Sequence, residues 1–355
     1  MELSSSMKGR FSMTHKERVM AAIRHEKPDR VPRGELAIEK NLLRKLIGDD
    51  RFACLDDNER LLAAIRELGG DLVNIHQFPM EQVRQTSAGP VFRSVLGDEH
   101  IIANGSSCLH KRAMDDIRQA GTYQAPDPST CLTDNLDWFL ANSGLFVFAQ
   151  VMGPVSSLDW MLGTEDYMVW AMTDTEDIKA VTAKVVDYEI ARACTFIDHG
   201  ADAIMIADDI AFNTGLFLPP RIMDELAWPF YRQMIAAIKT REDVPVFLHT
   251  DGDIRAALAL IVDCGFDGLQ SLQPSAGMDI VAVKRQYGDK LCLMGNMDLD
   301  HLMTFGTPEE VAEQAAWLCE NIGFDGGYIL STCNILTDAV PEANARAMYG
   351  AGAGA

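Results

Sequence analysis

Short apolar runs alternate with amphipathic stretches along most of this chain. The runs are rich in Val, Ile and Leu, and each is about as long as a strand buried in a parallel sheet. Eight of them follow one another, with helical patterns between most pairs. They cover Val31–Ile38, Asp71–Ile75, Phe146–Met152, Ala203–Ala207, Val244–His249, Gly268–Leu272, Leu291–Gly295 and Tyr328–Ser331.

The stretches between these runs predict helices. The longest, Thr175–His199, carries apolar residues at helical spacing and ends at Gly200, a common C-terminal stop. Further helices are predicted over Pro219–Lys239, Ile254–Cys264, Asp279–Tyr287 and Thr307–Ile322. Strand–helix alternation repeated eight times favours a parallel (β/α)8 TIM barrel. An open doubly wound sheet is the competing α/β fold, but no glycine-rich phosphate loop follows the first strand.

The same patterns predict one domain. We expect a single barrel over residues 14–349, with an irregular insertion at about 77–140 that carries short β-like pieces. The polar residues 1–13 predict a disordered extension, and residues 350–355 a flexible tail.

Composition narrows the class of protein. The 355 residues are 48% hydrophobic and 23% charged, which is typical of a soluble globular enzyme. A formal net charge of −21 makes nucleic acid an unlikely ligand class, because phosphate binding needs a basic surface. No apolar run is long enough to span a bilayer, no signal peptide is recognisable, and the eight cysteines form no C-x-x-C pair. We therefore expect a cytoplasmic protein with reduced cysteines and no membrane contact.

The fifth apolar run ends in two potential metal ligands. His249 and Asp251 are two residues apart, so their side chains point to the same face if the strand continues that far. Gly252 follows and allows the backbone to turn. Because barrel enzymes build their active sites at the carboxyl ends of the strands, this pair lies where chemistry is expected.

Other strand ends add polar candidates and few cations, which argues against a polyanionic substrate. Asp208 and Asp209 are adjacent, so only one of them can face the pocket. Cys333 is either a ligand or nucleophile, or a small buried residue; His76 is either a site residue or a structural histidine; and Glu35 either orients a ligand or pairs with Arg30 or Arg33. The remaining candidates are Gln150, Gln273 and Asn296, and Gln270 is a further polar residue at a strand end.

Several segments resemble the uroporphyrinogen decarboxylase superfamily, and more closely its corrinoid-dependent methyltransferase branch. They extend from Thr14 to about Met348 and read KERVMAAIRHEKPDRVP, MGPVSSLDWMLGTEDY, GADAIMIADDIAFNTGLFLPP, HTDGDI, LMGNMD, GTPEEV and GGYILSTCNI. The resemblance implies a (β/α)8 barrel, in agreement with the eight runs. It also implies a zinc-assisted methyl transfer with a corrinoid carried by a partner protein.

Departures from the family patterns bear on the branch. The arginine-rich signature with which the decarboxylases grip their substrate is missing from RVPRGELAIEKNLLRKL, and Cys333 stands where they place a histidine. The methyltransferases use His-x-Cys and a distant Cys as zinc ligands. His249 and Cys333 match that pattern, whereas Asp251 replaces the middle cysteine. Zinc accepts a carboxylate, so we still expect a zinc site, with Asp251 either as a third ligand or as a residue that orients the ligands.

The sequence therefore predicts a methyltransferase that moves a methyl group between a small methylated donor, such as a methyl ether or methylamine, and a corrinoid protein. Two alternatives stay open: a metal-free decarboxylase in which Asp71 or Asp209 acts electrostatically, and a non-catalytic barrel that binds a corrinoid protein or small ligand. The oligomeric state is also open, with a homodimer as one option. The expected roles are metal ligation by His249, Asp251 and Cys333, catalysis by Asp209 and Glu35, and substrate binding by Gln150, Gln273, Asn296 and His76.

Overall fold

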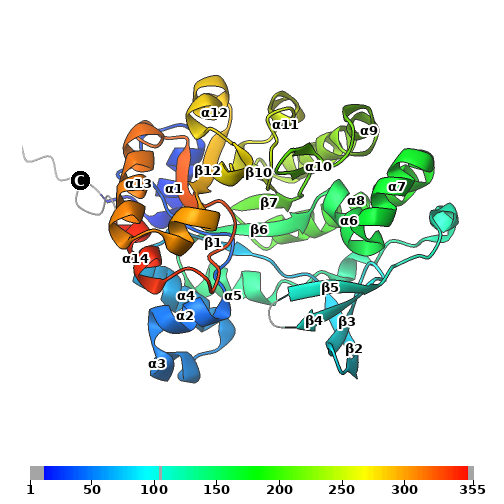
Figure 1. Ribbon diagram of the computed structural model, residues 1–355, viewed down its shortest axis with the longest axis horizontal. Helices are drawn as coiled ribbons and strands as arrows, with labels where there is room; N and C mark the ends of the chain where they lie inside the picture. Colours follow the sequence, from blue (N-terminus) through cyan, green and yellow to red (C-terminus); the bar gives the residue numbers. More distant parts are fainter. Residues whose placement is uncertain (1–11, 104–105, 351–355) are drawn as a thin grey trace, which may run out of the picture.

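The computed structural model describes residues 12–103 and 106–350 (Figure 1). The predicted terminal extension, up to residue 11, and the predicted tail from residue 351 lie outside the described residues. Within the described chain, seven parallel strands form one curved sheet in the order β1-β6-β7-β10-β11-β12-β13. Their bounds are β1 Leu72–Ile75, β6 Phe146–Met152, β7 Ala203–Ala207, β10 Val246–Thr250, β11 Gly268–Ser271, β12 Cys292–Met297 and β13 Tyr328–Thr332.

An irregular segment takes the eighth position in the barrel. Residues 32–38 run between β13 and β1, with isolated bridges at Arg33–Leu330 and Ile38–Leu336. The Asp71 backbone N–H, just before β1, donates to the Arg33 carbonyl at 2.8 Å. The prediction of a regular strand over Val31–Ile38 is therefore wrong, but the segment does close the barrel between β13 and β1. Pro32 lacks an N–H, and the Asn74 side chain donates to the Leu36 carbonyl at 3.3 Å in place of a ladder bond.

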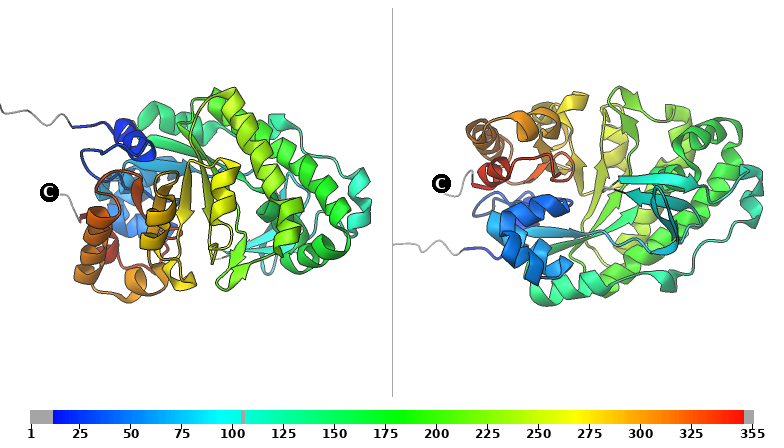
Figure 2. Two further views of the ribbon diagram at one scale, coloured as in Figure 1. Left: turned by 90° about the horizontal axis from the view of Figure 1, so that it is seen from above. Right: turned by 60° about the horizontal axis from the view of Figure 1, so that its bottom comes forward.

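Helices surround this sheet and leave the strands inside (Figure 2). Two predictions need correction. The helix expected over Pro219–Lys239 is two helices that meet at Ala227, because Pro229 favours a new first turn. The helix expected from Ile254 begins at Leu258. The helices are α1 His15–Ile23, α2 Lys40–Ile47, α3 Asp49–Cys54, α4 Asp57–Leu68, α5 Asp134–Asn142, α6 Pro154–Leu162, α7 Thr164–Thr173, α8 Thr175–Asp198, α9 Pro220–Leu226, α10 Trp228–Arg241, α11 Leu258–Cys264, α12 Ile280–Tyr287, α13 Pro308–Asn321 and α14 Glu342–Gly350. Short 3₁₀ turns cover Ile117–Thr122, Pro128–Thr130 and Pro274–Ala276, and a π-helical turn covers Leu299–Met303.

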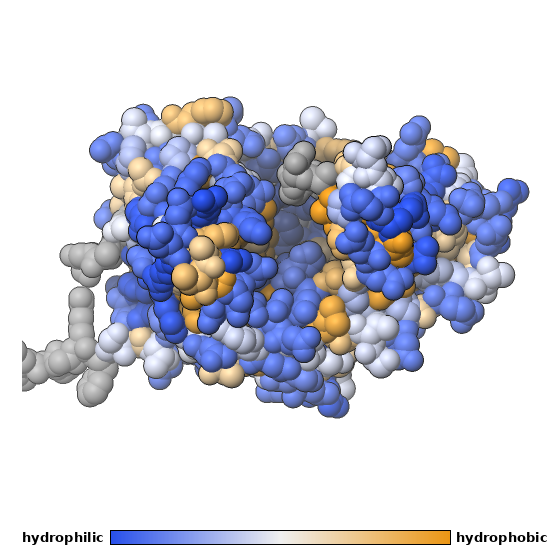
Figure 3. Space-filling view, turned by 90° about the horizontal axis from the view of Figure 1, so that it is seen from below, coloured by the Kyte–Doolittle hydropathy of each residue, from blue (hydrophilic) through white to orange (hydrophobic). Residues whose placement is uncertain are grey.

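The predicted insertion contains a small antiparallel sheet beside the barrel (Figure 1). His100 stacks on Trp160 of α6 with ring centroids 4.3 Å apart, which attaches this sheet to the barrel wall. The face that carries α2–α4 and this sheet is hollowed between them (Figure 3). The sheet consists of β2 Met80–Thr86, β3 Gly89–Ser94, β4 Glu99–Ala103 and β5 Ser106–Lys111, and a separate hairpin pairs β8 Ala211–Phe212 with β9 Gly215–Leu216.

Two apolar cores hold the fold together. One lies between the sheet and the helices. The other fills the barrel interior with alternate residues of the strands, including Phe146 and Phe148 of β6, Phe247 of β10 and Met294 of β12. Because side chains alternate along a strand, the residues two and four positions further along also face the interior. No helix in the described chain is both long and apolar enough to cross a membrane.

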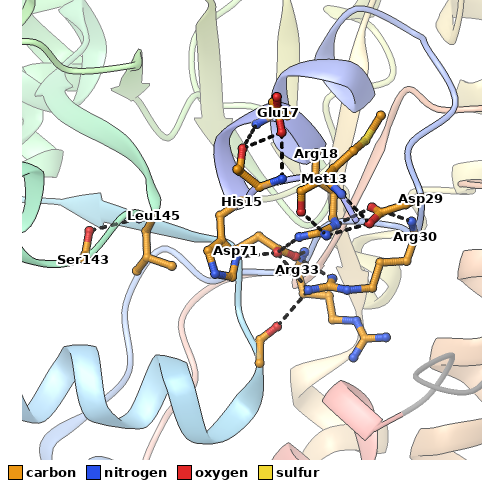
Figure 4. A network of polar contacts seen from close by, with 12 residues as sticks. Met13, His15, Glu17, Arg18, Asp29, Arg30, Arg33, Asp71, Ser143 and Leu145 are labelled. Atoms are coloured by element: carbon orange, nitrogen blue, oxygen red, sulfur yellow. Dashed lines mark hydrogen bonds and ion pairs between the residues drawn. The ribbon is translucent and has the colours of Figure 1, made fainter. Parts of the chain in front are cut away.

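The amino-terminal end of the barrel is closed by a charged cluster around Asp71 (Figure 4). The Asp71 side chain is fully buried and accepts hydrogen bonds from Arg18 at 2.7 Å and from Arg30 at 2.6 and 2.9 Å. His15 and the Arg33 backbone N–H complete the set. Asp71 precedes β1, so it lies at the amino ends of the strands, opposite to the carboxyl ends where barrel enzymes place their active sites. The role that a decarboxylase reading assigned to Asp71 is therefore wrong.

Candidate metal centre at the carboxyl ends of the strands

Three potential ligands come together at the carboxyl ends of β7 and β10. One ligand atom each from Asp209, His249 and Asp251 lies within 4.8 Å of the other two. The His249 Nε2 is 3.8 Å from the Asp209 Oδ1. Register explains the meeting, because His249 of β10 pairs with Ala207 of β7 and Asp209 follows two residues later on the same face.

The turn after β10 depends on Gly252. Its φ of +87° is a conformation that residues with a side chain rarely adopt, and a Cβ there would lie 2.5 Å from the Ala211 carbonyl oxygen. The β8–β9 hairpin therefore packs directly on this turn. Asp253 N–H donates to the Phe212 carbonyl at 2.8 Å and fixes the contact.

A neighbouring glutamine fixes the tautomer of His249. Gln270 of β11 donates its Nε2 to the Thr332 carbonyl at 3.2 Å, so its Oε1 faces His249 and accepts from Nδ1. In the neutral ring Nδ1 therefore carries the proton, which leaves the lone pair on Nε2, the nitrogen near Asp209. A histidine ligand is normally oriented in this way by the hydrogen bond of its other nitrogen.

Neutral donors hold the two carboxylates. Asp251 accepts from Ser271 Oγ at 2.5 Å and from the Asn334 amide, while Asp209 accepts from the Asp251 backbone N–H at 3.0 Å. Burial raises the pKa of Asp251, and the negative charge of Asp209 adds to the rise, although His249 and the two hydrogen bonds oppose it. Within the described residues, the hydrogen bonds and ion pairs of the three side chains involve no lysine or arginine. The group therefore brings two carboxylates together without a lysine or arginine beside them.

The two adjacent aspartates after β7 have different tasks. Asp208 is fully buried and accepts from the Val155 and Ser156 backbone N–H groups at the start of α6, as well as from Tyr231. Burial raises the pKa of Asp208 to about 7. Asp209 faces the mouth instead and is half exposed.

Cys333 is not one of the three grouped ligands. It follows β13, is buried, and its backbone N–H donates to the Met297 carbonyl at 3.0 Å. Burial raises the pKa of the Cys333 thiol to about 12, so the thiol is protonated at neutral pH. The structure thus has Asp209 in the group where the sequence prediction had Cys333.

Glu35 is also outside this group. Its carboxylate accepts from Ser331 Oγ, from the Thr332 backbone and side chain, and from the Tyr349 hydroxyl. These bonds tie the closing segment to β13 and α14. Burial raises the pKa of Glu35 to about 7.

The predicted substrate-binding residues lie at other strand ends. Gln273 accepts from the Gly252 N–H at 3.0 Å, next to the metal group, and Asn296 donates to the Leu272 carbonyl at 2.6 Å. Gln150 faces the interior from β6. His76 follows β1 and keeps contact with solvent, but the protein around it removes part of its hydration; this desolvation, together with the charge of Arg192, lowers the pKa of His76 to about 4.

Sequence reasoning named Gln270 among the polar residues at the strand ends but gave no role to it, to Ser271 or to Asn334, the residues that position the ligands. Gln270 is a strand-end glutamine, and its pairing with His249 follows only from the register of β10 with β11. Ser271 follows Gln270 and Asn334 follows Cys333, but no local pattern at either position predicts a bond to Asp251.

Comparison with known proteins gives the family. A family model described as uroporphyrinogen decarboxylase (URO-D) matches residues 134–353. The chain belongs to the uroporphyrinogen decarboxylase family. The match includes the three grouped ligands and Cys333.

Individual relatives of two kinds are similar to this chain. A uroporphyrinogen decarboxylase of Chlorobaculum tepidum is 32% identical over 141 residues, which is 39% of this chain and 37% of the relative. A methylcobamide:CoM methyltransferase of Methanosarcina barkeri is 24% identical over 200 residues, 56% of this chain and 55% of the relative. The chain thus matches only about a third to a half of the length of these curated relatives.

A solved structure supports the architecture. A methyltransferase from Methanosarcina mazei superposes with a TM-score of 0.74 at 19% identity, over 96% of this chain and 98% of that one. The predicted uroporphyrinogen decarboxylase-like α/β barrel is confirmed.

Proposed function

We propose that this chain is a methyltransferase that moves a methyl group between a small methylated donor and a corrinoid held by a partner protein. A divalent metal, with zinc as the expected ion, is held by Asp209, His249 and Asp251. The observation that carries the proposal is the meeting of these three ligand atoms within 4.8 Å at the barrel mouth. The similarity to the Methanosarcina barkeri methyltransferase supports the reaction class.

The three side chains fit a catalytic zinc site. Zinc accepts histidine nitrogen and carboxylate oxygen, and catalytic sites keep three protein ligands and one open position. The carboxylates supply the negative charge that the ion needs, and Nε2 of His249 is free to bind. Once bound, the ion acts as a Lewis acid toward an oxygen or nitrogen atom that carries the methyl group.

The chain's own residues prepare this site before any substrate enters. Gln270 keeps the proton of His249 on Nδ1, and Ser271 and Asn334 fix the plane of the Asp251 carboxylate. The ligand set contains no thiolate, so it is harder than a cysteine-rich set. This favours a methyl ether or methylamine over a thiol as the molecule at the metal. The corrinoid protein would dock over the carboxyl ends of the strands. We also propose that the protein is cytoplasmic and forms a homodimer.

Metal content and methyl transfer test the proposal together. Purified protein is expected to contain about one zinc per chain by elemental analysis, and to methylate free cob(I)alamin from a suitable methyl donor. His249→Ala is expected to abolish both, whereas His199→Ala is a matched control, because His199 pairs with Asp137 on the surface. The proposal is contradicted if wild-type protein contains no metal and His249→Ala leaves methyl transfer unchanged. Metal without turnover across a panel of methyl donors favours a non-catalytic binding barrel.

A decarboxylase is the second candidate, favoured by the 32% identity to the Chlorobaculum tepidum enzyme. Asp209 would then act electrostatically from the mouth. The scarcity of lysine and arginine at the strand ends disfavours a polycarboxylate such as uroporphyrinogen. Incubation with uroporphyrinogen decides, because coproporphyrinogen forms only if the decarboxylase assignment is correct.

A further inference from the structure

A chain of hydrogen bonds fixes the orientation of the Gln150 amide inside the barrel. The Leu36 carbonyl accepts from Asn74 Nδ2 at 3.3 Å, which settles which end of the Asn74 amide carries the hydrogens. The same Nδ2 donates to Gln150 Oε1 at 2.7 Å. The NH₂ end of Gln150 must therefore point the other way.

That NH₂ group is available to a ligand. Gln150 lies on the same strand face as Phe146 and Phe148 of the interior core, so it faces the barrel interior. It keeps some exposure although its strand neighbours Ala149 and Val151 are buried. Within the described residues, no group accepts a hydrogen bond from Gln150 Nε2. The amide thus presents a fixed donor to the space above the core.

The donor lies on the same side of the barrel as the metal group, with one strand between β6 and β10, and deeper in the interior. By register, His249 pairs with Ala207 and Ala207 pairs with Met152, so Gln150 is two strands away and two residues deeper. Strand spacing and rise put the two Cα atoms roughly 12 Å apart. Both side chains face the interior, so a molecule held at the metal group would have Gln150 on its inner side.

We infer that Gln150 Nε2 binds a hydrogen-bond acceptor of the methylated substrate, and that Asn74 is the positioning residue that keeps the donor turned inward. This rests on the proposed function and narrows its substrate class to methylated donors that carry a second hydrogen-bond acceptor, besides the atom that bears the methyl group. A quaternary methylammonium has no acceptor, so it leaves the Gln150 donor without a partner.

Asn74→Asp reverses the donor. A carboxylate cannot donate to Gln150 Oε1, so the Gln150 amide turns over and presents its oxygen to the interior. The probes are 1,2-dimethoxyethane, a neutral acceptor, and tetramethylammonium, a cation without one. Their dissociation constants are measured by NMR titration. Wild-type protein is expected to prefer the ether, and Asn74→Asp to reduce that preference about tenfold, as the loss of one hydrogen bond and an unpaired oxygen predict.

A second variant guards against misfolding of the first. Gln150→Met keeps the side-chain length, removes the donor, and is expected to weaken ether binding about tenfold with little change for tetramethylammonium. Gln286→Met, on the surface of α12, is the matched control and should change neither. Where a methyl ether turns over, Gln150→Met should raise KM more than it lowers kcat.

The outcomes separate this inference from the proposed function. An unchanged ether preference in both Asn74→Asp and Gln150→Met, with zinc still bound at His249, overturns the inference alone. Loss of preference in both variants supports it. Wild-type protein without zinc overturns the metal centre whatever the probe preference is.

Discussion

The two ends of this barrel both contain aspartates that are buried or partly buried, but only one end supplies them with lysine or arginine. Asp71 at the amino-terminal end is fully buried and receives two guanidinium groups, from Arg18 and Arg30 (Figure 4). Asp251 at the carboxyl end receives only Ser271 and Asn334, and a second carboxylate, Asp209, lies beside it. Asp71, with its two arginine partners, stabilises the fold, whereas Asp209 and Asp251 are suited to bind a positively charged ligand such as a metal ion. Removing an acid should therefore have opposite effects on stability at the two ends.

The largest effect is expected at the amino-terminal end. Asp71→Asn removes the buried carboxylate that the buried Arg18 and the partly exposed Arg30 share. Since Arg18 keeps its bonds to Asp29, we expect a loss of about 3 kcal/mol in the free energy of unfolding. Denaturant unfolding measures it. Asp49→Asn is the control, because the Asp49–Arg44 pair is exposed and should contribute very little. Equal free energies of unfolding for the two variants would show that the arginine pairs of Asp71 do not stabilise the fold.

Glu35, in the segment that closes the barrel, shows how burial without a neighbouring cation changes the pKa of an acid. The pKa of Glu35 rises from 4.5 to about 7 because it is buried, so the folded chain holds this proton more tightly than the unfolded chain. The contribution of Glu35 to stability is complete below pH 4.5 and is lost as the pH rises toward 7. At about 1.4 kcal/mol per pKa unit, the loss is about 3 kcal/mol.

Glu35→Gln isolates that contribution, since glutamine does not titrate. Relative to wild type, the unfolding free energy of the variant is expected to rise by about 3 kcal/mol between pH 4.5 and pH 7.5. Denaturant unfolding at both values gives this difference, in which other titrating groups cancel. A difference that does not change with pH would mean that Glu35 is ionised in the folded chain.

The smallest effect has the opposite sign and lies at the carboxyl end. Asp251→Asn removes the repulsion between two carboxylates in the metal-free protein, and we expect a gain of about 1 kcal/mol in stability. The same change should weaken zinc binding. Thermal unfolding with and without a chelator checks both, with the exposed Asp263→Asn as a control. A destabilised metal-free variant would indicate that Asp251 has a structural role.

Much of the fold follows from the sequence because buried parallel strands are continuous apolar runs. Seven of the eight predicted runs are strands, and the exception contains Pro32, where tertiary contacts replace regular pairing. The insertion was harder to predict because its strands are mostly half exposed and lack a long apolar run.

The candidate site followed from the sequence only in part. The spacing of His249 and Asp251 predicted that both point the same way, and the structure brings their ligand atoms together although β10 ends at Thr250. The contribution of Asp209 depends on the register between β7 and β10, and that of Gln270 on the register between β10 and β11. Register between distant strands is set by packing of the whole barrel, which local patterns do not reveal.

Competitive zinc titration of two variants tests the central claim most directly. The structure groups Asp209 with His249 and Asp251, whereas Cys333 lies outside this group as a buried thiol. Asp209→Asn is therefore expected to weaken zinc binding on the order of a hundredfold, and Cys333→Ser to leave it unchanged. Undiminished affinity in Asp209→Asn, with loss of zinc in Cys333→Ser, would contradict the metal centre described above.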